Sequence, residues 1–348
     1  MADILRYACI GAGKIALKKH LGVYAGIPGV EMAAVCDASR EVAQTAADRF
    51  GIPGVYTDLE EMLKKEQIDF ASVCTPNCLH VPMSMALVER GIHVHCEKPV
   101  GMSAVEVEAL KQAVDRKGVT FMAGLNFRFS REAEQIQSYL RKGRLGDIYH
   151  AKCGWMRRNG IPGSGVWFTV KDLSGGGPLI DLGVHYLDLL MMYLEYPEVA
   201  SVKAHTYKKF AGATSRIREG YPDRGEGVFD VEDMAVGLIS MKNGASVCFE
   251  FSWASNVEAE HRYITLLGTR GGIDCRNGVV KYIGEKAGRP ADEISPSEPV
   301  AVGKPDTAEH LHFLECLRAG QQPRASLEQA LKLMHIIDAA YASAGEAK

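Results

Sequence analysis

The sequence contains no apolar run that approaches the roughly 20 residues of a membrane-spanning helix, so no membrane-embedded segment is expected. It also lacks an excess of charge of one sign, because 40 basic and 43 acidic residues give a net charge of −3 over 348 positions. Nucleic acid and membrane surfaces are therefore not expected as partners. Low-complexity segments and internal repeats are missing too, which leaves a globular chain long enough for two domains.

The nine cysteines include no Cys-x-x-Cys pair, and their number is odd. Several fall in predicted strands, a pattern typical of reduced, buried thiols rather than of a disulfide framework. Met1-Ala2-Asp3 leads directly into the first predicted strand without the apolar stretch of a signal peptide. We therefore expect a cytoplasmic protein.

A glycine-rich turn follows the first predicted strand, at residues 5–10. The residues Gly11-Ala12-Gly13-Lys14-Ile15-Ala16 match the dinucleotide-binding fingerprint, with alanine as the third small residue. Gly11 permits the tight turn and Gly13 lets the backbone approach a pyrophosphate, while the helix that follows offers N–H groups to the phosphates. The sequence therefore predicts a bound dinucleotide at this turn.

A second predicted strand, residues 31–36, ends in Asp37, about 20 residues beyond the glycines. A carboxylate there accepts hydrogen bonds from the ribose 2′-hydroxyl and repels a 2′-phosphate, which favours NAD over NADP. Arg40 lies close by and could instead bind a 2′-phosphate, so NADP stays open as the alternative. A purely structural role for Asp37, capping the next helix, is the competing interpretation.

Strands and helices alternate through the first third of the chain. Further strands are predicted near 69–74, 92–96 and 119–123, with helices near 41–50, 58–66, 79–90 and 103–117. Apolar strands interleaved with amphipathic helices indicate a parallel sheet covered on both faces. We therefore expect an α/β, doubly wound Rossmann domain over residues 1–125.

Two of the predicted strand ends carry polar residues. Thr75-Pro76-Asn77-Cys78-Leu79-His80 follows one strand, and Cys96-Glu97-Lys98-Pro99 follows the next. Ligands of such sheets bind beyond the carboxyl ends of the strands, where a lysine can donate to a substrate oxygen and stabilise a developing alkoxide. A solvated surface lysine is the competing interpretation of Lys98.

An acid and a histidine follow a run of glycines, Gly175-Gly176-Gly177, which predicts a flexible hinge before a helix. Asp181 and His185 are four positions apart and Asp188 lies three further on, so all three can project from one helix face. A carboxylate beside an imidazole orients the ring and adjusts its pKa, as proton transfer requires. A capped histidine at a helix end is the structural alternative.

The trio could also ligate a divalent ion with His80 as a distant fourth ligand. No Cys/His cluster with the spacing of a zinc site accompanies it, and we expect no metal.

Longer β-prone runs dominate from about residue 145. They lie at 148–157, 198–208, 232–241, 245–253 and 261–268, and Asn243-Gly244 between two of them is a strong hairpin signal. These runs predict an α+β domain over residues 126–325 with one large, mostly antiparallel open sheet. The loop 157–171 carries Arg and Trp side chains suited to sugar hydroxyls and ring faces, or it is an ordinary connection with its aromatics in the core. The segment 208–230 is longer than usual loops and is a lid, an interface arm or disordered.

Taken together, these motifs resemble the Gfo/Idh/MocA family (glucose–fructose oxidoreductase and inositol 2-dehydrogenase). They are GAGKIA, Asp37, TPNCLH, CEKP and GGG followed by DxGxHxxD, and the likeness extends to residues 124–129 and 231–233. The resemblance spans nearly the whole chain. It implies a closing helix within 326–348 that returns to the nucleotide-binding domain. It also implies a homo-oligomer, a dimer or tetramer, formed through the open sheet face.

The resemblance also assigns roles to individual residues. It implies that Lys98 is the catalytic lysine, that the Lys98–Pro99 bond is often cis, and that Asp181 and His185 flank the reacting carbon. From the motifs and the resemblance together, the predicted cofactor contacts are Gly11, Gly13, Lys14, Ile15, Asp37, Arg40, Thr75, Pro76, Asn77, His80, Glu97 and Lys98. The substrate contacts are Lys98, Asn126, Arg128, Arg157, Trp167, Asp181 and His185.

The predicted function is that of an NAD(H)-dependent dehydrogenase acting on a secondary hydroxyl of a sugar, glycoside or cyclic polyol, with C3 of a pyranoside as one case. His185 would accept the hydroxyl proton while Lys98 stabilises the alkoxide. An NAD-assisted glycosidase with internal redox cycling is one alternative. A non-catalytic NAD sensor is another alternative. The presence of Lys98, Asp181 and His185 argues against it, because a sensor needs no proton-transfer residues.

Overall fold

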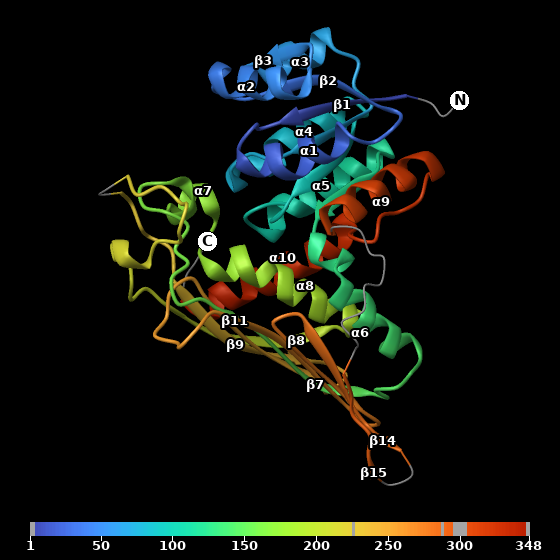
Figure 1. The fold of residues 1–348 in the computed structure, drawn as a ribbon, viewed down its shortest axis with the longest axis vertical. Helices are drawn as coiled ribbons and strands as arrows, with labels where there is room; N and C mark the ends of the chain where they lie inside the picture. Colours follow the sequence, from blue (N-terminus) through green and yellow to red (C-terminus); the bar gives the residue numbers. More distant parts are fainter. Residues whose placement is uncertain (1–3, 225–226, 287–288, 295–304, 346–348) are drawn as a thin grey trace. The chain divides into compact units, whose positions relative to one another are not determined.

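The computed structural model describes residues 4–224, 227–286, 289–294 and 305–345 (Figure 1). The chain divides into two compact units, the first formed by Met1–Asn126 with Gly303–Leu331 and the second by Phe127–Val302 with Lys332–Lys348. The expected boundary at 325/326 therefore differs from the observed one. Helix α9 (Pro305–Ala319) belongs to the first unit, where it contacts α1 (Leu21–Tyr24), and α10 (Leu327–Ser343) contributes residues to both units.

The first unit is built on a six-stranded sheet with the order β3-β2-β1-β4-β5-β6, in which every neighbouring pair is parallel. This order confirms the predicted doubly wound Rossmann domain. The strands are β1 (Leu5–Ile10), β2 (Val30–Cys36), β3 (Gly54–Tyr56), β4 (Phe70–Val73), β5 (His93–Glu97) and β6 (Phe121–Gly124). The other helical segments of this unit are η1 (Ala16–His20), α2 (Arg40–Phe50), α3 (Leu59–Lys65), η2 (Asn77–Leu79), α4 (His80–Glu89) and α5 (Ala104–Lys117). The short turn η3 (Asn126–Phe129) begins in the first unit and continues into the second.

Local chemistry explains where these helices begin and end. The side chains of Ser39, Asp58 and Ser103 accept hydrogen bonds from backbone N–H groups in the first turns of α2, α3 and α5. At their other ends, α2 and α5 stop at Gly51 and Gly118, whose backbones are left-handed. Strands β4 and β6 are buried at every position, as expected of a parallel sheet covered on both faces.

The second unit contains an eight-stranded sheet with the order β16-β13-β12-β11-β7-β10-β9-β8. Its pairs are antiparallel except for β7 with β10, which confirms the mostly antiparallel sheet. The strands are β7 (Ile148–Met156), β8 (Val199–Tyr207), β9 (Met234–Met241), β10 (Ser246–Ser252), β11 (His261–Gly268), β12 (Gly272–Arg276), β13 (Val279–Ile283) and β16 (Glu293–Ile294), and β14 (Glu285–Lys286) pairs separately with β15 (Arg289–Pro290). The predicted hairpin joins β9 to β10 through Asn243 and Gly244.

Helical segments cover one face of the eight-stranded sheet (Figure 1). They are α6 (Arg131–Arg141), η5 (Leu179–Gly183) and α8 (Val184–Tyr193), and their sheet partners are β13, β10 and β7. Short helical turns η4 (Trp167–Thr169), α7 (Lys171–Ser174) and η6 (Thr214–Arg216) lie in the connections. On the covered face Ile239, Val247 and Phe251 are buried, whereas Leu238 on the opposite face is 41% exposed.

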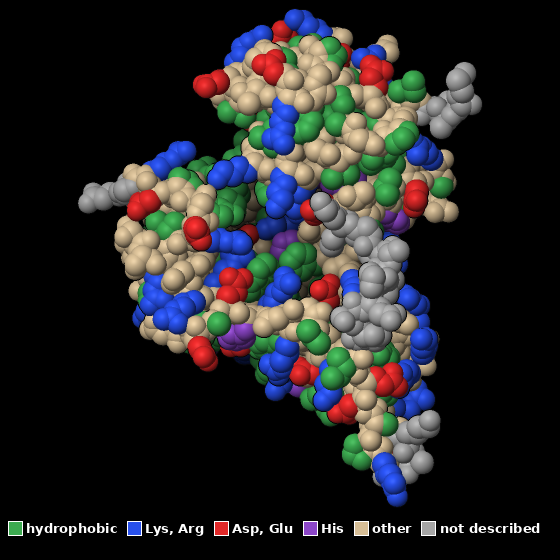
Figure 2. All heavy atoms as spheres, viewed as in Figure 1, with side chains coloured by type: hydrophobic (Ala, Val, Ile, Leu, Met, Phe, Trp, Pro, Cys, Tyr) green, Lys and Arg blue, Asp and Glu red, His purple; other side chains and the backbone are tan. Residues whose placement is uncertain are grey.

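The surface in Figure 2 carries Lys and Arg side chains interspersed with Asp and Glu. This distribution agrees with the near-neutral charge of the sequence. Among the residues that the structure describes, no helix is both long and apolar enough to cross a bilayer. All nine cysteines are free thiols.

Candidate functional site

The glycine-rich turn joins β1 to η1 in the first unit. Gly11 has a φ of +84°, and a side-chain carbon added there would lie 2.8 Å from the carbonyl group of Cys74 at the end of β4. Only glycine fits this turn without a shift of the backbone. A carbon added at Gly13 would meet nothing within 4 Å, so space is open on that side of the turn. Lys14 and Ile15 are exposed. The turn therefore fits a dinucleotide pyrophosphate.

Asp37 follows the end of β2 and is tied to the same turn. Its Oδ2 accepts a hydrogen bond of 2.8 Å from the N–H of Ala12, and its Oδ1 accepts one of 2.9 Å from Ser39. A carboxylate has about four acceptor sites, so these bonds fix its orientation and leave capacity for ribose hydroxyls. The capping interpretation thus holds only in part, since the N-cap of α2 is Ser39. Arg40 is exposed.

His80 connects the two polar strand ends. Its Nδ1 lies 2.5 Å from the carbonyl oxygen of Pro99 and its Nε2 lies 2.8 Å from that of Thr75, while the ring is 1% exposed. Burial lowers the pKa of His80, although the two carbonyls favour its charged form. A ring held in this way links the loop after β4 to the loop after β5. We therefore propose a positioning role for His80, in place of the cofactor contact predicted for it from the sequence.

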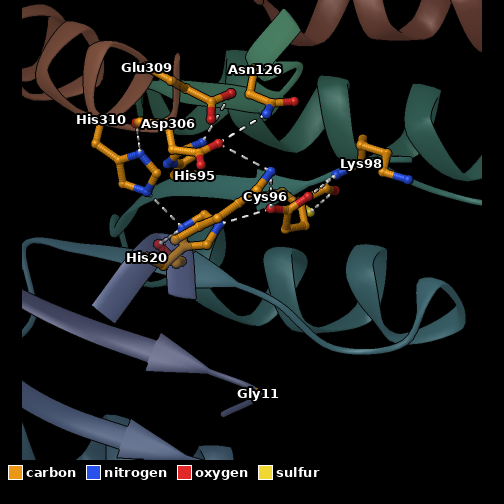
Figure 3. A network of polar contacts seen from close by, with 12 residues as sticks. Gly11, His20, His95, Cys96, Lys98, Asn126, Asp306, Glu309 and His310 are labelled. Carbon is orange, nitrogen blue, oxygen red and sulfur yellow. Dashed lines mark hydrogen bonds and ion pairs between the residues drawn. The ribbon is translucent and has the colours of Figure 1, made fainter. Parts of the chain in front are cut away.

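Lys98 directly follows β5, and its peptide bond to Pro99 is cis, as the resemblance implied. The preceding Glu97 is 9% exposed, and its Oε1 lies 3.1 Å from His20 Nε2 and 3.8 Å from Lys19 Nζ (Figure 3). Its Oε2 accepts a long hydrogen bond of 3.3 Å from the N–H of Lys98. Burial alone would raise the pKa of Glu97, but Lys19, His20 and Lys98 lower it well below its usual value. Glu97 thus anchors the Lys98 backbone as an anion.

The other expected residues of the first unit lie at the strand ends. Thr75 and Pro76 are half-buried and Asn77, in η2, is 6% exposed. Asn126, expected to contact substrate, is 8% exposed and its amide donates a 3.0 Å hydrogen bond to Asp306 at the start of α9. The contribution of α9 to this end of the unit was missed, because 180 residues separate the two partners.

In the second unit, Asp181 and His185 lie on a helix that is not uniform. Asp181 is in the π-helical segment η5, and His185 is in the first turn of α8. Wide π turns are rare and often mark functional sites. Asp181 Oδ2 accepts a 2.9 Å hydrogen bond from the indole N–H of Trp253, a residue that nothing in the sequence pattern indicated.

The imidazole of His185 is held by an aromatic contact. It stacks on Phe127 with ring centroids 4.4 Å apart and an interplanar angle of 18°, and it is 8% exposed. Arg157 is also in this unit, 5% exposed, with its guanidinium over the ring of Trp155. Burial lowers the pKa of Arg157, and the opposite charge of Asp181 counteracts that effect. A carboxylate, an imidazole and a guanidinium are thus available in the second unit.

Arg128 and Asp188 do not have the roles that the sequence suggested. The guanidinium of Arg128 is 2% exposed and forms hydrogen bonds of 2.7 and 2.5 Å to the two oxygens of Asp188, with a further one to the hydroxyl of Tyr196. Although burial opposes the charged form, Asp188 raises the pKa of Arg128. The expected substrate contact of Arg128 is therefore replaced by a buried ion pair with Asp188.

The glycine run before η5 is tightly packed, which corrects the expectation of a flexible hinge. A side-chain carbon at Gly177 would lie 1.9 Å from the carbonyl oxygen of Glu232, and one at Gly176 would lie 2.0 Å from the hydroxyl of Tyr341. The buried Glu232 carboxylate accepts hydrogen bonds from Gly177 N–H at 2.8 Å, Leu179 N–H at 3.1 Å and Tyr341 Oη at 2.9 Å. Glu232 thus fixes the start of the helix that carries Asp181.

Glu232 makes the stability of this unit depend on pH. Burial raises its pKa from 4.5 to about 7, against the lowering effect of its three donors. The unfolded chain releases this proton near pH 4.5 while the folded chain retains it to about pH 7, so the contribution to stability falls as pH rises between these values. The side chain of Glu232→Gln stays neutral at every pH, so this variant lacks the effect. Between pH 4.5 and pH 7 we expect the free energy of unfolding of the parent to fall by about 3 kcal/mol relative to that of Glu232→Gln.

Urea unfolding of both proteins across this range measures that difference. Glu258→Gln, at an exposed carboxylate of the same unit, is the control and should track the parent at every pH. Parallel curves for the parent and Glu232→Gln would show that Glu232 is ionised throughout.

The remaining specificity candidates belong to one loop region of the second unit. Trp167 is half-buried and stacks on Phe168 with centroids 3.8 Å apart. The described part of the segment 208–230 packs along the loop after β7, through bridges between Ile161 and Ile217 and between Ser164 and Asp223. These contacts join the loop 157–171 to the segment 208–230, which were predicted as two separate regions.

Comparison with known proteins agrees with this architecture. Residues 5–125 match the model of the oxidoreductase family with an NAD-binding Rossmann fold, named for Gfo, Idh and MocA, and residues 133–274 match the model of the C-terminal domain of that family. D-glucoside 3-dehydrogenase of Escherichia coli (strain K12) is 37% identical over 256 residues, which cover 74% of this chain and 72% of the relative. A putative UDP-kanosamine synthase oxidoreductase subunit of Amycolatopsis mediterranei (strain S699) is 32% identical over 273 residues, or 78% and 75% of the two chains.

A solved structure shares the fold. Levoglucosan dehydrogenase, in a complex with NADH and levoglucosan, superposes with a TM-score of 0.86 over 98% of this chain and 97% of its own, at 22% identity. At this identity the likeness concerns the fold alone.

Proposed function

The chain belongs to the Gfo/Idh/MocA family of NAD-dependent oxidoreductases, and from this premise we propose that it oxidises the C3 hydroxyl of a pyranoside, preferably a glucoside, to the ketone. The observation that carries the proposal is the 37% identity to a D-glucoside 3-dehydrogenase in a chain that keeps Lys98, Asp181 and His185. The cofactor, when bound, supplies the acceptor for the hydride that leaves the carbon. The chain's own residues bind the sugar, orient it and move its hydroxyl proton.

In the proposed reaction His185 takes the proton of the reacting hydroxyl. Its plane is set by stacking on Phe127, and the negative charge of Asp181 favours the imidazolium that forms. Asp181 is itself oriented by the indole N–H of Trp253. Lys98 donates to the oxygen as negative charge develops on it, while the C–H bond breaks and the C=O bond forms. Loss of one hydride and one proton balances the oxidation of the alcohol to the ketone.

Recognition of the sugar is assigned to the second unit. Arg157 and Trp167 offer a guanidinium and an aromatic face, as a pyranoside with several hydroxyls requires. We assign NAD rather than NADP as the working cofactor because Asp37 places a carboxylate, fixed by two backbone N–H groups, where a 2′-phosphate would lie.

The test incubates the protein with NAD or NADP and a panel of glucosides, free sugars and inositols while nicotinamide reduction is followed by absorbance. Reduction of NAD with glucosides, and a 3-keto product by NMR, is the expected result. Reduction only with inositols or free sugars would refute the glucoside assignment. Silence across the panel, with NADH binding intact, would refute the dehydrogenase and favour glycoside cleavage with internal redox cycling or a sensor.

We further propose that the open face of the eight-stranded sheet forms a homo-oligomer. This face is hollowed and lined by residues including Val236, Leu238, Cys248 and Tyr263, and the 41% exposure of Leu238 leaves a large apolar side chain in water. Leu238→Arg should reduce the mass of the particle in sedimentation to that of one chain, since a buried unpaired guanidinium opposes association. Val105→Arg, at an exposed position of α5 in the first unit, is the control and should leave the mass unchanged. An unaltered mass for Leu238→Arg would exclude this face.

A further inference from the structure

Three buried histidines converge in the first unit, away from the glycine-rich turn (Figure 3). His20 comes from η1, His95 from β5 and His310 from α9, and they are 1%, 0% and 0% exposed. One nitrogen of each ring lies within 4.8 Å of the corresponding nitrogens of the other two. The ring centroids are 4.7 to 4.9 Å apart, so the rings surround a common point.

Each histidine uses one nitrogen for a partner outside the cluster. His20 Nε2 lies 3.1 Å from Glu97 Oε1, His310 Nδ1 lies 2.5 Å from the Asp306 carbonyl oxygen, and His95 Nδ1 lies 3.1 Å from the Tyr24 hydroxyl. Histidines that bind metal characteristically donate their other N–H to a carboxylate, a carbonyl or a similar acceptor. All three rings have this outer arrangement.

The remaining nitrogens are left as lone pairs in neutral rings. Because a carboxylate and a carbonyl only accept, His20 Nε2 and His310 Nδ1 carry the protons. His20 Nδ1 and His310 Nε2 are then both acceptors, yet they face each other at 3.3 Å. The hydroxyl of Ser72, 2.8 Å from His20 Nδ1, can donate to only one of them. A cation between the two nitrogens would turn this repulsion into attraction.

A buried carboxylate completes the group. Glu309 is 1% exposed, and its Oε1 lies 3.8 Å from His95 Nε2, too far for a hydrogen bond. Both atoms are without a hydrogen-bond partner among the described residues. Lys19 contacts Glu97 and Asp306 at 3.8 and 3.4 Å, so within the described part of the chain His95 is the only group in ion-pair contact with Glu309. A buried carboxyl group without a cation takes up a proton, because the buried anion is costly, and a bound metal ion would instead hold it as the carboxylate.

We propose that His20, His95, His310 and Glu309 form a closed structural site for a divalent transition-metal ion, with Zn²⁺ as the best match. Three imidazoles and one carboxylate are a donor set that zinc prefers, and bonds of about 2.0–2.1 Å at tetrahedral angles place neighbouring ligand atoms about 3.4 Å apart. The observed separations of 3.3 and 3.8 Å bracket that value. Binding would draw the more distant nitrogen inward. Since all four residues are buried, no position is left open for a substrate.

The proposed ion would join η1, β5 and α9. His95 and Glu97 are two positions apart in β5, so their side chains lie on the same face of the sheet. Because Glu97 also holds the backbone of Lys98, the proposed site adjoins the strand end that precedes the lysine. This role is independent of the sugar that the protein oxidises. Metal removal should therefore lower the midpoint of thermal unfolding, and Zn²⁺ should restore it.

The experiment uses the full chain without a histidine tag. The protein is stripped with a chelator, its metal content is checked by mass spectrometry, and it is titrated with Co²⁺, whose intense visible absorption reports four-coordinate binding. We expect one ion per chain, displaced by Zn²⁺ in equal amount. His310→Gln should abolish the Co²⁺ spectrum, whereas His335→Gln, at an exposed histidine of α10, should retain it.

Glu309→Gln provides a second variant if His310→Gln does not fold, and we expect it to weaken Co²⁺ binding by about 10-fold or more. Absence of any bound ion in the parent chain would mean that a proton holds the rings together, and would overturn the proposal. Binding that persists unchanged in His310→Gln and Glu309→Gln would overturn it as well, because the ion would then lie elsewhere.

Discussion

Lys98→Met will lower kcat for glucoside oxidation by about 10²–10³-fold and leave the dissociation constant of NADH nearly unchanged. Removal of one donor from a developing oxyanion typically has an effect of this size. Methionine keeps the length of the stem and removes the ammonium group. The dinucleotide contacts that we propose for Gly11 and Asp37, which directly follow β1 and β2, do not depend on the Lys98 side chain. Steady-state kinetics and fluorescence titration with NADH measure the two quantities.

Two further variants sharpen this prediction. Lys98→Arg keeps the charge but spreads it over a planar fork, so a partial loss is expected, smaller than that of methionine. Lys18→Met, at an exposed lysine of η1, is the matched control and should retain full turnover. If Lys98→Met oxidises the substrate at the parental rate, the lysine is a solvated side chain at a strand end, which was the competing interpretation.

The first unit followed from the sequence nearly element by element. Its strands are buried at least over their carboxyl-terminal parts, so they appear in the sequence as short apolar runs that differ clearly from the helical patterns. Predicted and observed strands agree within about two residues. The strand β3 was missed because three residues, Gly54–Tyr56, show no period. No strand was predicted beyond β11, although β12 and β13 continue the sheet. These strands were missed because five residues give only weak alternation of apolar and polar side chains.

The sequence predicted which residues belong to the candidate site, but not which residues they contact. Motifs of local sequence placed Lys98 after a strand and Asp181 with His185 on a helix. The partner of Asp181 is Trp253, 72 positions away, and nothing in the local pattern around residue 253 signals it. The same holds for His20, His95 and His310, whose separations of 75 and 215 positions hide the cluster from any motif with zinc spacing.

The π-helical turn shows a limit of predicting a shared helix face from residue spacing. A regular α-helix starting at Pro178 would place Asp181, His185 and Asp188 on one face. In the structure the π-helical segment η5 widens the turn before α8 begins. Asp188, which is buried in α8, forms an ion pair with Arg128. A spacing argument assumes one helical period. It still applies to His185 and Asp188, which are both in α8, but not to Asp181, because the period changes between Asp181 and His185.

Arg128→Met will destabilise the second unit by about 3–5 kcal/mol, because it leaves Asp188 as an uncompensated charge with 1% exposure. Thermal and urea unfolding, followed by circular dichroism, measure this loss. Arg141→Met, at an exposed arginine of α6, is the matched control and should change stability by less than about 0.5 kcal/mol.

A double variant separates the ion pair from a role in substrate binding. Arg128→Met combined with Asp188→Leu removes both charges, so it should recover much of the stability that Arg128→Met alone loses. If Arg128 contacted the sugar instead, Arg128→Met would fold with unchanged stability and raise KM, and the second change would restore nothing. The bidentate geometry of 2.7 and 2.5 Å favours the first outcome, since it orients both oxygens of Asp188 toward one guanidinium and fixes α8 against the segment that carries Phe127. Loss of the pair would then reach catalysis only indirectly, through the ring of His185 that Phe127 supports.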